Sequence, residues 1–87
     1  SKDDREHCGK IYSCIQNAAE SLKTSPVKIV IEKATDFLEN ACFEIDYLEV
    51  VDANNLSLIT KKTNKMLIAV AVIYKKVRLI DNIVVSL

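Results

Sequence analysis

The sequence has little glycine, proline and histidine, with one residue of each (Gly9, Pro26 and His7) among 87, and it has no tryptophan. Loops that bind phosphate through backbone amides are rich in glycine, so a complete nucleotide site is not expected. One histidine and three widely separated cysteines do not have the spacing of metal ligands. We therefore predict that the chain holds no metal ion.

Long apolar runs are also absent. The longest, residues 66–74, has nine residues, whereas a helix that spans a bilayer needs about 20. The first residues do not resemble a signal peptide. Cys8, Cys14 and Cys42 are an odd number of thiols and cannot all form disulfides, so we interpret them as reduced, buried thiols. These features predict a cytoplasmic protein without a membrane partner.

The charges balance overall, at 12 basic and 12 acidic residues, but they are distributed unevenly. Residues 43–59 contain four acids and no base, and residues 60–87 contain six basic side chains against Asp81, a local excess of +5. A basic surface can bind a phosphate or an acidic partner, and it can also be ordinary solvated charge. Nucleic acid is not the partner we expect, because the three tyrosines, which would stack on bases, lie on three different predicted elements.

The first half of the chain predicts two amphipathic helices. Apolar residues recur with a period of 3.6 across residues 1–23, where Ser1 is the expected N-cap. A break follows, with Ser25 as the expected cap and Pro26 at the first position of a second helix that continues through residues 27–41. Two helices joined by a short turn form a helical hairpin.

After the second helix the apolar period changes to two, which predicts strands. Residues 43–51 form the first strand, on which Ile45 and Leu48 are expected to face opposite sides. Residues 56–59 are a candidate short edge strand. Residues 66–74 are apolar throughout, which is typical of a central strand covered on both faces. Residues 77–85 are expected to pair with this strand as a hairpin.

These elements predict the α+β fold class. The expected architecture is an N-terminal helical hairpin packed on a three-stranded, or slightly larger, antiparallel sheet. A chain of 87 residues is the length of one small domain, so residues 1–87 are assigned to a single domain.

Three groups of side chains resemble catalytic arrangements without matching one. The sequence E-H-C-G-K around His7 lacks the second histidine of a phosphate-binding H-x-G-H motif, so His7 is interpreted as a partly exposed helix residue. The adjacent His7 and Cys8 point about 100° apart on a helix and do not form a nucleophile pair. Glu44 and Asp46 are predicted on one strand face and Glu49 on the other, which favours a solvated surface over a carboxylate cluster.

The last strand holds polar residues among apolar ones. Arg78 and Asn82 are predicted on one face, and Asp81 on the other with Leu79 and Ile83. A buried polar group without a partner costs about 1–3 kcal/mol, so these residues form either a hydrogen-bonding hub or a contact with a partner. The alternation alone does not distinguish the two.

Three parts of the sequence resemble the C-terminal domain of the pantoate–β-alanine ligase family. One block is similar to the pattern D-Y-x-E-x-x-D-A-x-x-L, a second to A-x-x-x-G-x-T-R-L-I-D-N, and the start to S-x-x-x-R. The matching residues are Ser1, Arg5, Asp46, Tyr47, Glu49, Asp52, Ala53, Leu56, Ala71, Arg78, Leu79, Ile80, Asp81 and Asn82. Lys75 stands in place of the glycine of the second block, and Val77 in place of its threonine.

The resemblance implies that the full enzyme joins pantoate to β-alanine with ATP and Mg²⁺, through a pantoyl-adenylate, and that this domain is a lid over the nucleotide site. The family's N-terminal Rossmann-like domain, which carries H-x-G-H, does not occur in this sequence. Neither does the S-S-R-N loop, which in the family contacts the ATP phosphates just before the first helix of this domain. The segment alone is therefore expected to be inactive, with no catalytic residue and no bound cofactor.

The same resemblance gives expectations for individual residues. Arg78, Asp81 and Asn82 are a structural or interdomain motif, for which a hydrogen-bonding hub is favoured over contact with the nucleotide domain. Lys75 and Lys76 are candidate phosphate-facing residues. The isolated domain is a candidate for self-association through the surface that would meet the missing domain. The alternative function is a free-standing interaction or nucleic-acid-binding module.

Overall fold

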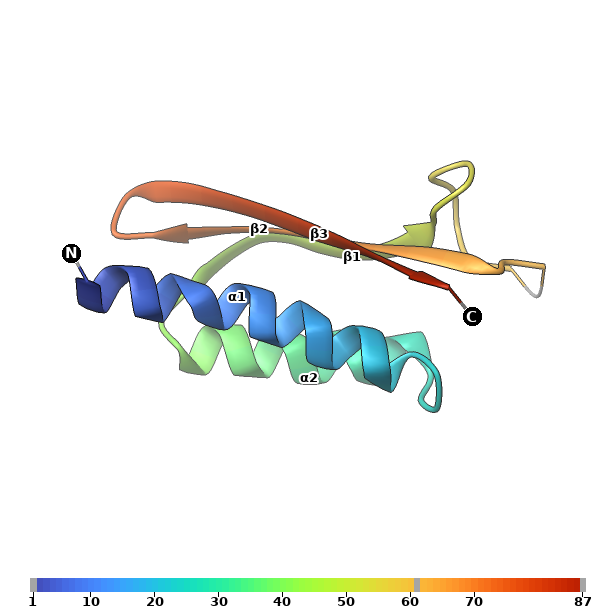
Figure 1. Ribbon diagram of the computed structural model, residues 1–87, viewed down its shortest axis with the longest axis horizontal. Helices are drawn as coiled ribbons and strands as arrows, with labels where there is room; N and C mark the ends of the chain where they lie inside the picture. Colours follow the sequence, from blue (N-terminus) through green and yellow to red (C-terminus); the bar gives the residue numbers. More distant parts are fainter. Residues whose placement is uncertain (1, 61, 87) are drawn as a thin grey trace.

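Two layers make up the structure, a pair of helices and a three-stranded sheet (Figure 1). The computed structural model describes residues 2–60 and 62–86. The elements follow in the order α1 (Lys2–Ser21), α2 (Val27–Asn40), β1 (Glu44–Asp52), β2 (Lys65–Tyr74) and β3 (Val77–Ser86). The molecule is elongated, with extents of 43 × 22 × 18 Å. The predicted α+β class, with a helical hairpin against three antiparallel strands, is confirmed.

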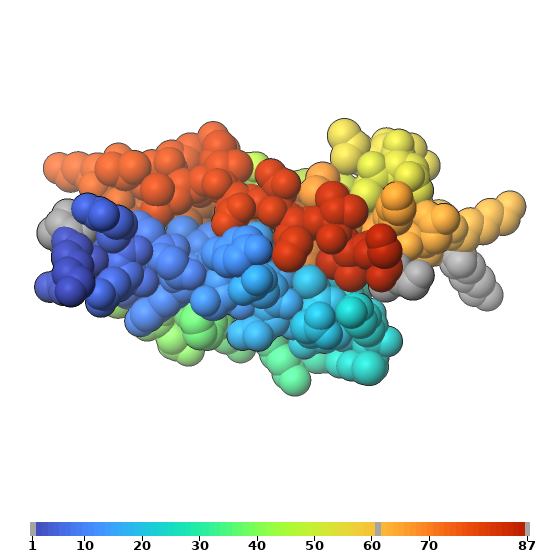
Figure 2. All heavy atoms as spheres, viewed as in Figure 1, coloured from blue at the N-terminus to red at the C-terminus, as the bar shows by residue number. Residues whose placement is uncertain are grey.

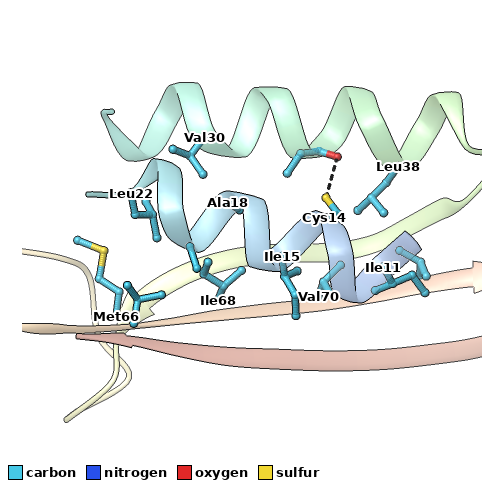
Figure 3. Close-up of a cluster of buried hydrophobic side chains, with 14 of the residues drawn as sticks. Ile11, Cys14, Ile15, Ala18, Leu22, Val30, Leu38, Met66, Ile68 and Val70 are labelled. Carbon is cyan, nitrogen blue, oxygen red and sulfur yellow. Dashed lines mark hydrogen bonds between the residues drawn. The ribbon is translucent and has the colours of Figure 1, made fainter. Parts of the chain in front are cut away.

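One hydrophobic core fills the space between the helices and the sheet. Ile15 of α1, Leu38 of α2 and both Ile68 and Val70 of β2 have no exposed surface. Figure 3 shows these side chains converging from the two layers. Complete burial of one such side chain stabilises a fold by about 1.5–3 kcal/mol, so this core holds the helical hairpin on the sheet.

The start of α2 differs from the prediction. Ser25 is not its cap, because the Ser25 backbone N–H donates to the Ser21 carbonyl at 2.8 Å and completes the turn after α1. Pro26 is the N-cap rather than the first helical residue, with an extended ψ of 147°, and its carbonyl accepts from the Val30 N–H. Proline has no N–H to satisfy, so it suits this junction between two helices. Ser1, the predicted cap of α1, lies outside the described residues.

β2 is the central strand and runs antiparallel to both β1 and β3, as predicted. The prediction that residues 66–74 are covered on both faces is wrong. Both helices lie on the same side of the sheet, and no described element covers the other side (Figure 1). The open side of β2 is apolar partly through the small residues Ala69 and Ala71, so the uninterrupted run did not require a second covering layer.

A β-bulge in β1 determines which side chains meet the helices. Ile45 lies opposite Val72 and Tyr47 lies opposite Ala71, so Asp46 is the extra residue. Because a bulge shifts the alternation by one position, Ile45 and Leu48 both pack against the core. The prediction that these two residues face opposite sides is therefore wrong.

Asp52 organises the loop that follows β1. The side chain is 8% exposed; Oδ1 accepts from the Asn54 N–H at 2.8 Å and Oδ2 accepts from the Thr63 hydroxyl at 2.9 Å. The predicted edge strand at residues 56–59 is wrong, because these residues pair with no strand and Leu58 is 84% exposed. The first part of the loop, drawn in yellow, rises on the side of the sheet away from the helices (Figure 1). One carboxylate thus ties the loop to the end of β1.

His7 connects α1 to the chain that enters β1. Its ring is stacked on Tyr74, with centroids 4.7 Å apart, and lies 4.9 Å from the Phe43 ring. Its Nε2–H donates to the Ala41 carbonyl. The prediction of a partly exposed helix histidine is confirmed. The contacts with Tyr74, Phe43 and Ala41 could not be predicted from the residues next to His7 in the sequence.

The three cysteines are free thiols that differ in exposure. Cys14 is buried, and its Sγ lies 3.8 Å from the Ala34 carbonyl, the contact drawn as a dashed line in Figure 3. Burial raises the pKa of the Cys14 thiol. Cys8 is partly buried and Cys42 is exposed, so the prediction of three buried thiols is wrong for Cys42. Cys42 lies in the turn between α2 and β1, where it has a left-handed φ of 67° and is exposed.

The turn between β2 and β3 is expected to gain stability from glycine. Lys75 and Lys76 have φ values of 50° and 68°, two successive positive angles typical of a type I′ turn. For a residue with a side chain this conformation costs about 1–2 kcal/mol, and glycine avoids that cost. Part of the gain is offset, because glycine gives the unfolded chain more conformational entropy. We expect Lys76→Gly to raise the free energy of unfolding by about 0.5–1 kcal/mol in urea denaturation. Lys23→Gly, at a turn position without positive φ, is the control, and an equal gain there would contradict the explanation.

Candidate functional site

The side of the sheet turned away from the helices, named the outer face, carries the candidate site. Its side chains alternate along each strand with those that enter the core. They are Glu44, Asp46, Tyr47, Glu49 and Val51 of β1, Lys65, Leu67, Ala69, Ala71 and Ile73 of β2, and Arg78, Ile80, Asn82, Val84 and Ser86 of β3. Ile80 and Val84 are 58% and 55% exposed, so apolar surface is open to solvent on this face.

Polar residues from both strand blocks that carry the family resemblance meet on the outer face. Asp46, Tyr47 and Glu49 come from the first block, and Arg78 and Asn82 from the second. The two blocks are distant in sequence, and their strands are separated by β2 in the sheet. Part of the resemblance therefore lies on one continuous surface, whereas Asp52, Leu79 and Asp81 of the same blocks face the helical side.

Arg78 reaches across β2 to β1. Its Nε donates to Asp46 Oδ2 at 3.0 Å, and its Nη2 lies 3.0 Å from the same oxygen. The guanidinium carbon lies 5.9 Å from the centre of the Tyr47 ring, within the range of a cation–π contact. Ala71, opposite Tyr47 in the register, is fully buried although no helix covers it, so neighbouring side chains shield it. The bulge at Asp46 places Tyr47 on the same side of β1 as Asp46, so both side chains face Arg78.

Asp81 and Asn82 point to opposite sides of β3, as predicted. Asp81 faces the helices, is partly buried, and its Oδ1 accepts from the Asn82 backbone N–H at 2.8 Å. The Asn82 side chain is exposed on the outer face, and its amide makes no hydrogen bond within residues 2–60 and 62–86. The geometry therefore favours a linking role between strands for Arg78, and leaves the Asn82 amide available to a partner.

The turn between β2 and β3, drawn in orange, lies at the end of the molecule where α1 begins (Figure 2). It contains Lys75 and Lys76. Lys75 Nζ donates to Asp4 Oδ1 at 2.6 Å and lies 5.5 Å from the centre of the Tyr74 ring. The hydrogen bond to Asp4, together with the charge of that carboxylate, raises the pKa of Lys75. Lys76 is exposed and forms no ion pair or hydrogen bond within the described ranges, so its ammonium group is the more accessible of the two.

The carboxylates of β1 do not form a cluster. Glu44 and Glu49 both lie on the outer face because of the bulge, so the prediction that Glu49 faces the other side is wrong. Asp46 is paired with Arg78. Within the described part of the chain, no three His, Cys, Asp or Glu side chains are placed to hold a metal ion. The helices in that part are too short or too polar to cross a membrane.

The Arg78–Asp46 pair is expected to contribute little to stability, because the two side chains are 50% and 45% exposed. In a double-mutant cycle with Arg78→Ala and Asp46→Ala, we expect a coupling of about 0.5 kcal/mol that decreases when about 0.5 M salt is added. Urea unfolding of the four proteins measures it. A coupling above about 2 kcal/mol would require a desolvated pair and would contradict this assignment.

Comparison with known proteins agrees with the motif residues on this face. A family model described as Pantoate-beta-alanine ligase matches residues 1–84. The pantothenate synthetase of Bacillus subtilis (strain 168) is 33% identical over 87 residues, covering 98% of this chain and 30% of that protein. The pantothenate synthetase of Shewanella halifaxensis (strain HAW-EB4) is 36% identical over 88 residues, covering 100% of this chain and 31% of that protein. A stretch of 42 residues is 60% identical to the pantothenate synthetase of Ruthia magnifica subsp. Calyptogena magnifica, and it covers 48% of this chain and 15% of that protein.

The chain thus spans 30–31% of the length of the two curated relatives that match it from end to end. The match runs through both helices and all three strands, and it includes the motif residues of the outer face. The chain therefore belongs to the pantoate–β-alanine ligase family.

Proposed function

We propose that this chain is the C-terminal lid domain of a cytoplasmic, ATP-dependent ligase that joins pantoate to β-alanine through a pantoyl-adenylate. One observation supports the proposal most directly: nearly the whole chain matches the family, yet the chain covers only 30% of the length of the Bacillus subtilis relative. The glycine content of the sequence supports it, because the chain has one glycine and no glycine-rich phosphate loop. The N-terminal Rossmann-like domain and the catalytic groups are assigned to the rest of the enzyme.

A lid has a clear chemical role in such a reaction. An acyl-adenylate is hydrolysed when water reaches it, and closure of a domain over the site excludes water until the amine attacks. The resemblance places a phosphate-contacting S-S-R-N loop just before α1. The turn that contains Lys76 lies at this same end of the domain, so its ammonium group is positioned to approach phosphate oxygens as a point charge.

Mg²⁺ neutralises phosphate charge in the full-length enzyme of this proposal. It prefers oxygen ligands and is usually held by one or two carboxylates together with the phosphates. Within the described residues no group of three metal-binding side chains occurs, and Asp4, the carboxylate beside this turn, is engaged with Lys75. Metal binding is therefore assigned to the part of the enzyme that this chain does not span.

A chimera tests the proposal. This chain replaces the matching part of the Bacillus subtilis pantothenate synthetase, and pantothenate formation from pantoate, β-alanine and ATP is measured. We expect turnover by the chimera, and activity at least about 100-fold lower for this chain alone and for the relative without its matching part. A folded chimera without turnover, or appreciable turnover by this chain alone, contradicts the proposal.

Lys76→Ala in the active chimera is expected to raise the KM for ATP about tenfold. One hydrogen bond to a charged group contributes about 1.5–3 kcal/mol, and about 1.4 kcal/mol corresponds to a factor of ten. Steady-state kinetics with varied ATP measure the effect. Lys62→Ala removes a lysine beyond the opposite end of β2 and is expected to leave KM unchanged. Equal effects of both substitutions would indicate general charge loss instead of a phosphate contact.

The alternative function is a free-standing interaction or nucleic-acid-binding module, and the arrangement of the aromatic residues does not favour its nucleic-acid-binding form. Tyr12 is exposed on α1, Tyr47 lies on the outer face, and Tyr74 is stacked on His7 on the helical side of the sheet. A stacking platform for bases requires aromatic rings on one surface.

A further inference from the structure

The two broad surfaces of the molecule differ in character. Exposed residues on the helices are mostly polar, and the large apolar ones among them, Tyr12, Ile29 and Phe37, are scattered. On the outer face, Ile80 and Val84 are more than half exposed, and the side chains of Leu67 and Ile73 beside them are only partly covered. The apolar surface that another layer would cover is therefore on the sheet.

Charge on the outer face is concentrated along β1. Glu44 and Glu49 are exposed there and form no ion pair within the described residues. Asp46 is neutralised by Arg78. On the β3 side the exposed polar side chains without a partner in the described residues are the neutral Asn82 and Ser86, and the one outer-face lysine, Lys65, lies at the end of β2 beside Ser86. A complementary surface would be apolar along its centre, basic toward β1, and able to hydrogen-bond an amide toward β3.

The width of the sheet favours one helix as the covering element. Neighbouring strands are about 4.8 Å apart, so β1 and β3 are separated by about 9.6 Å. A helix with its side chains is about 10–12 Å wide. A helix aligned with β2 would lie over the small residues Ala69 and Ala71 and would reach Glu49 on one side and Val84 on the other.

We propose that the outer face docks an amphipathic helix with a basic flank, located in the part of the full-length ligase that this chain does not span. This inference rests on the proposed function, in which about 70% of the enzyme lies outside the match, as in the Bacillus subtilis relative, of which 30% is covered. A sheet with helices on one face and an open apolar second face is completed by a further layer. The face would then be the contact between the lid and the body of the enzyme.

Thiol labelling in the chimera tests the docking. V84C probes the outer face, and E32C, at an exposed position on α2, is the matched control. After trypsin digestion the two positions fall in residues 79–87 and 29–33, which contain no native cysteine, so mass spectrometry reads each thiol separately. We expect similar maleimide rates in this chain alone, and a rate at least tenfold lower for V84C in the chimera. Equal V84C rates in both proteins would overturn the proposal.

A measurement in trans applies if the chimera does not fold. ¹⁵N-labelled chain is titrated with the Bacillus subtilis protein that lacks its matching part. Shift changes confined to the outer face, weakened at least fivefold by Glu49→Lys, support the docking. Changes on the exposed side of α1 and α2, or none at about 0.5 mM, overturn it.

These outcomes separate the inference from the proposed function. A protected V84C thiol in a folded but inactive chimera supports the docking and counts against the ligase role. An active chimera with an unprotected V84C thiol does the reverse. If the chimera sediments as an oligomer that Val84→Asp dissociates, a second copy is the occupant in the full-length protein and the proposal is overturned.

Discussion

Replacing Leu38 by alanine is expected to lower the free energy of unfolding by about 3 kcal/mol. Leu38 of α2 has no exposed surface, and it lies in the core between the helices and the sheet. Deletion of a buried leucine side chain costs about 2–5 kcal/mol, because transfer energy is lost and a cavity remains. A domain of 87 residues buries a small core, so a loss of this size is a large fraction of its total stability. Urea denaturation monitored by circular dichroism measures it.

Leu58→Ala is the matched control. It makes the same substitution at a leucine that is 84% exposed in the loop after β1. We expect a change within about 0.5 kcal/mol, as for other surface substitutions. A similar loss for Leu38→Ala and Leu58→Ala would mean that Leu38 does not lie in a close-packed core, and would contradict the assigned packing of α2 on the sheet.

Asp52→Ala is expected to cost about 2 kcal/mol. The substitution removes the acceptor for both the Asn54 N–H and the Thr63 hydroxyl at a site where the side chain is 8% exposed. A hydrogen bond to a charged group contributes about 1.5–3 kcal/mol, and water replaces part of the two lost bonds because Asn54 is exposed and Thr63 is partly buried. The effect should also be local, so hydrogen exchange of the Asn54 amide is expected to accelerate more than that of the β2 amides.

Two further substitutions are controls for the Asp52→Ala measurement. Asp52→Asn keeps an oxygen that can accept from Asn54, and a hydroxyl can turn to accept from its NH₂ group, so we expect less than half the loss. Asp36→Ala removes an exposed carboxylate from α2 and should change stability by less than about 0.5 kcal/mol. If Asp52→Ala resembled Asp36→Ala, the carboxylate would not be what holds the loop.

The order of the elements and the sides of the last strand could be predicted because they depend on local periodicity. Apolar spacing of 3.6 and then two distinguishes the helices from the strands, and alternation alone places Arg78 and Asn82 opposite Asp81. The family resemblance marked Asp46, Tyr47 and Arg78 as motif residues in two separate blocks, without indicating that they share a surface.

Three features of the structure could not be predicted, because each depends on one or two residues that do not change the apolar periodicity of the sequence. The extra residue at Asp46 reverses the sides of all later residues in β1, yet the stretch from Ile45 to Val50 reads equally well as a regular strand. The type I′ turn is made by Lys75 and Lys76, which carry none of the usual glycine or asparagine. The Arg78–Asp46 contact crosses a strand, so it appears only when the sheet is assembled.

The elongated shape has a mechanical consequence. β2 and β3 are ten residues each, about 33 Å of continuous strand along a molecule of 43 Å. The Lys76 turn lies at one end of this lever and the loop tied by Asp52 at the other. A hinge rotation of 10° about the loop end would move the turn by about 6 Å, about twice the length of a hydrogen bond. A small angular change at a hinge would therefore be enough to engage or release a phosphate contact at Lys76.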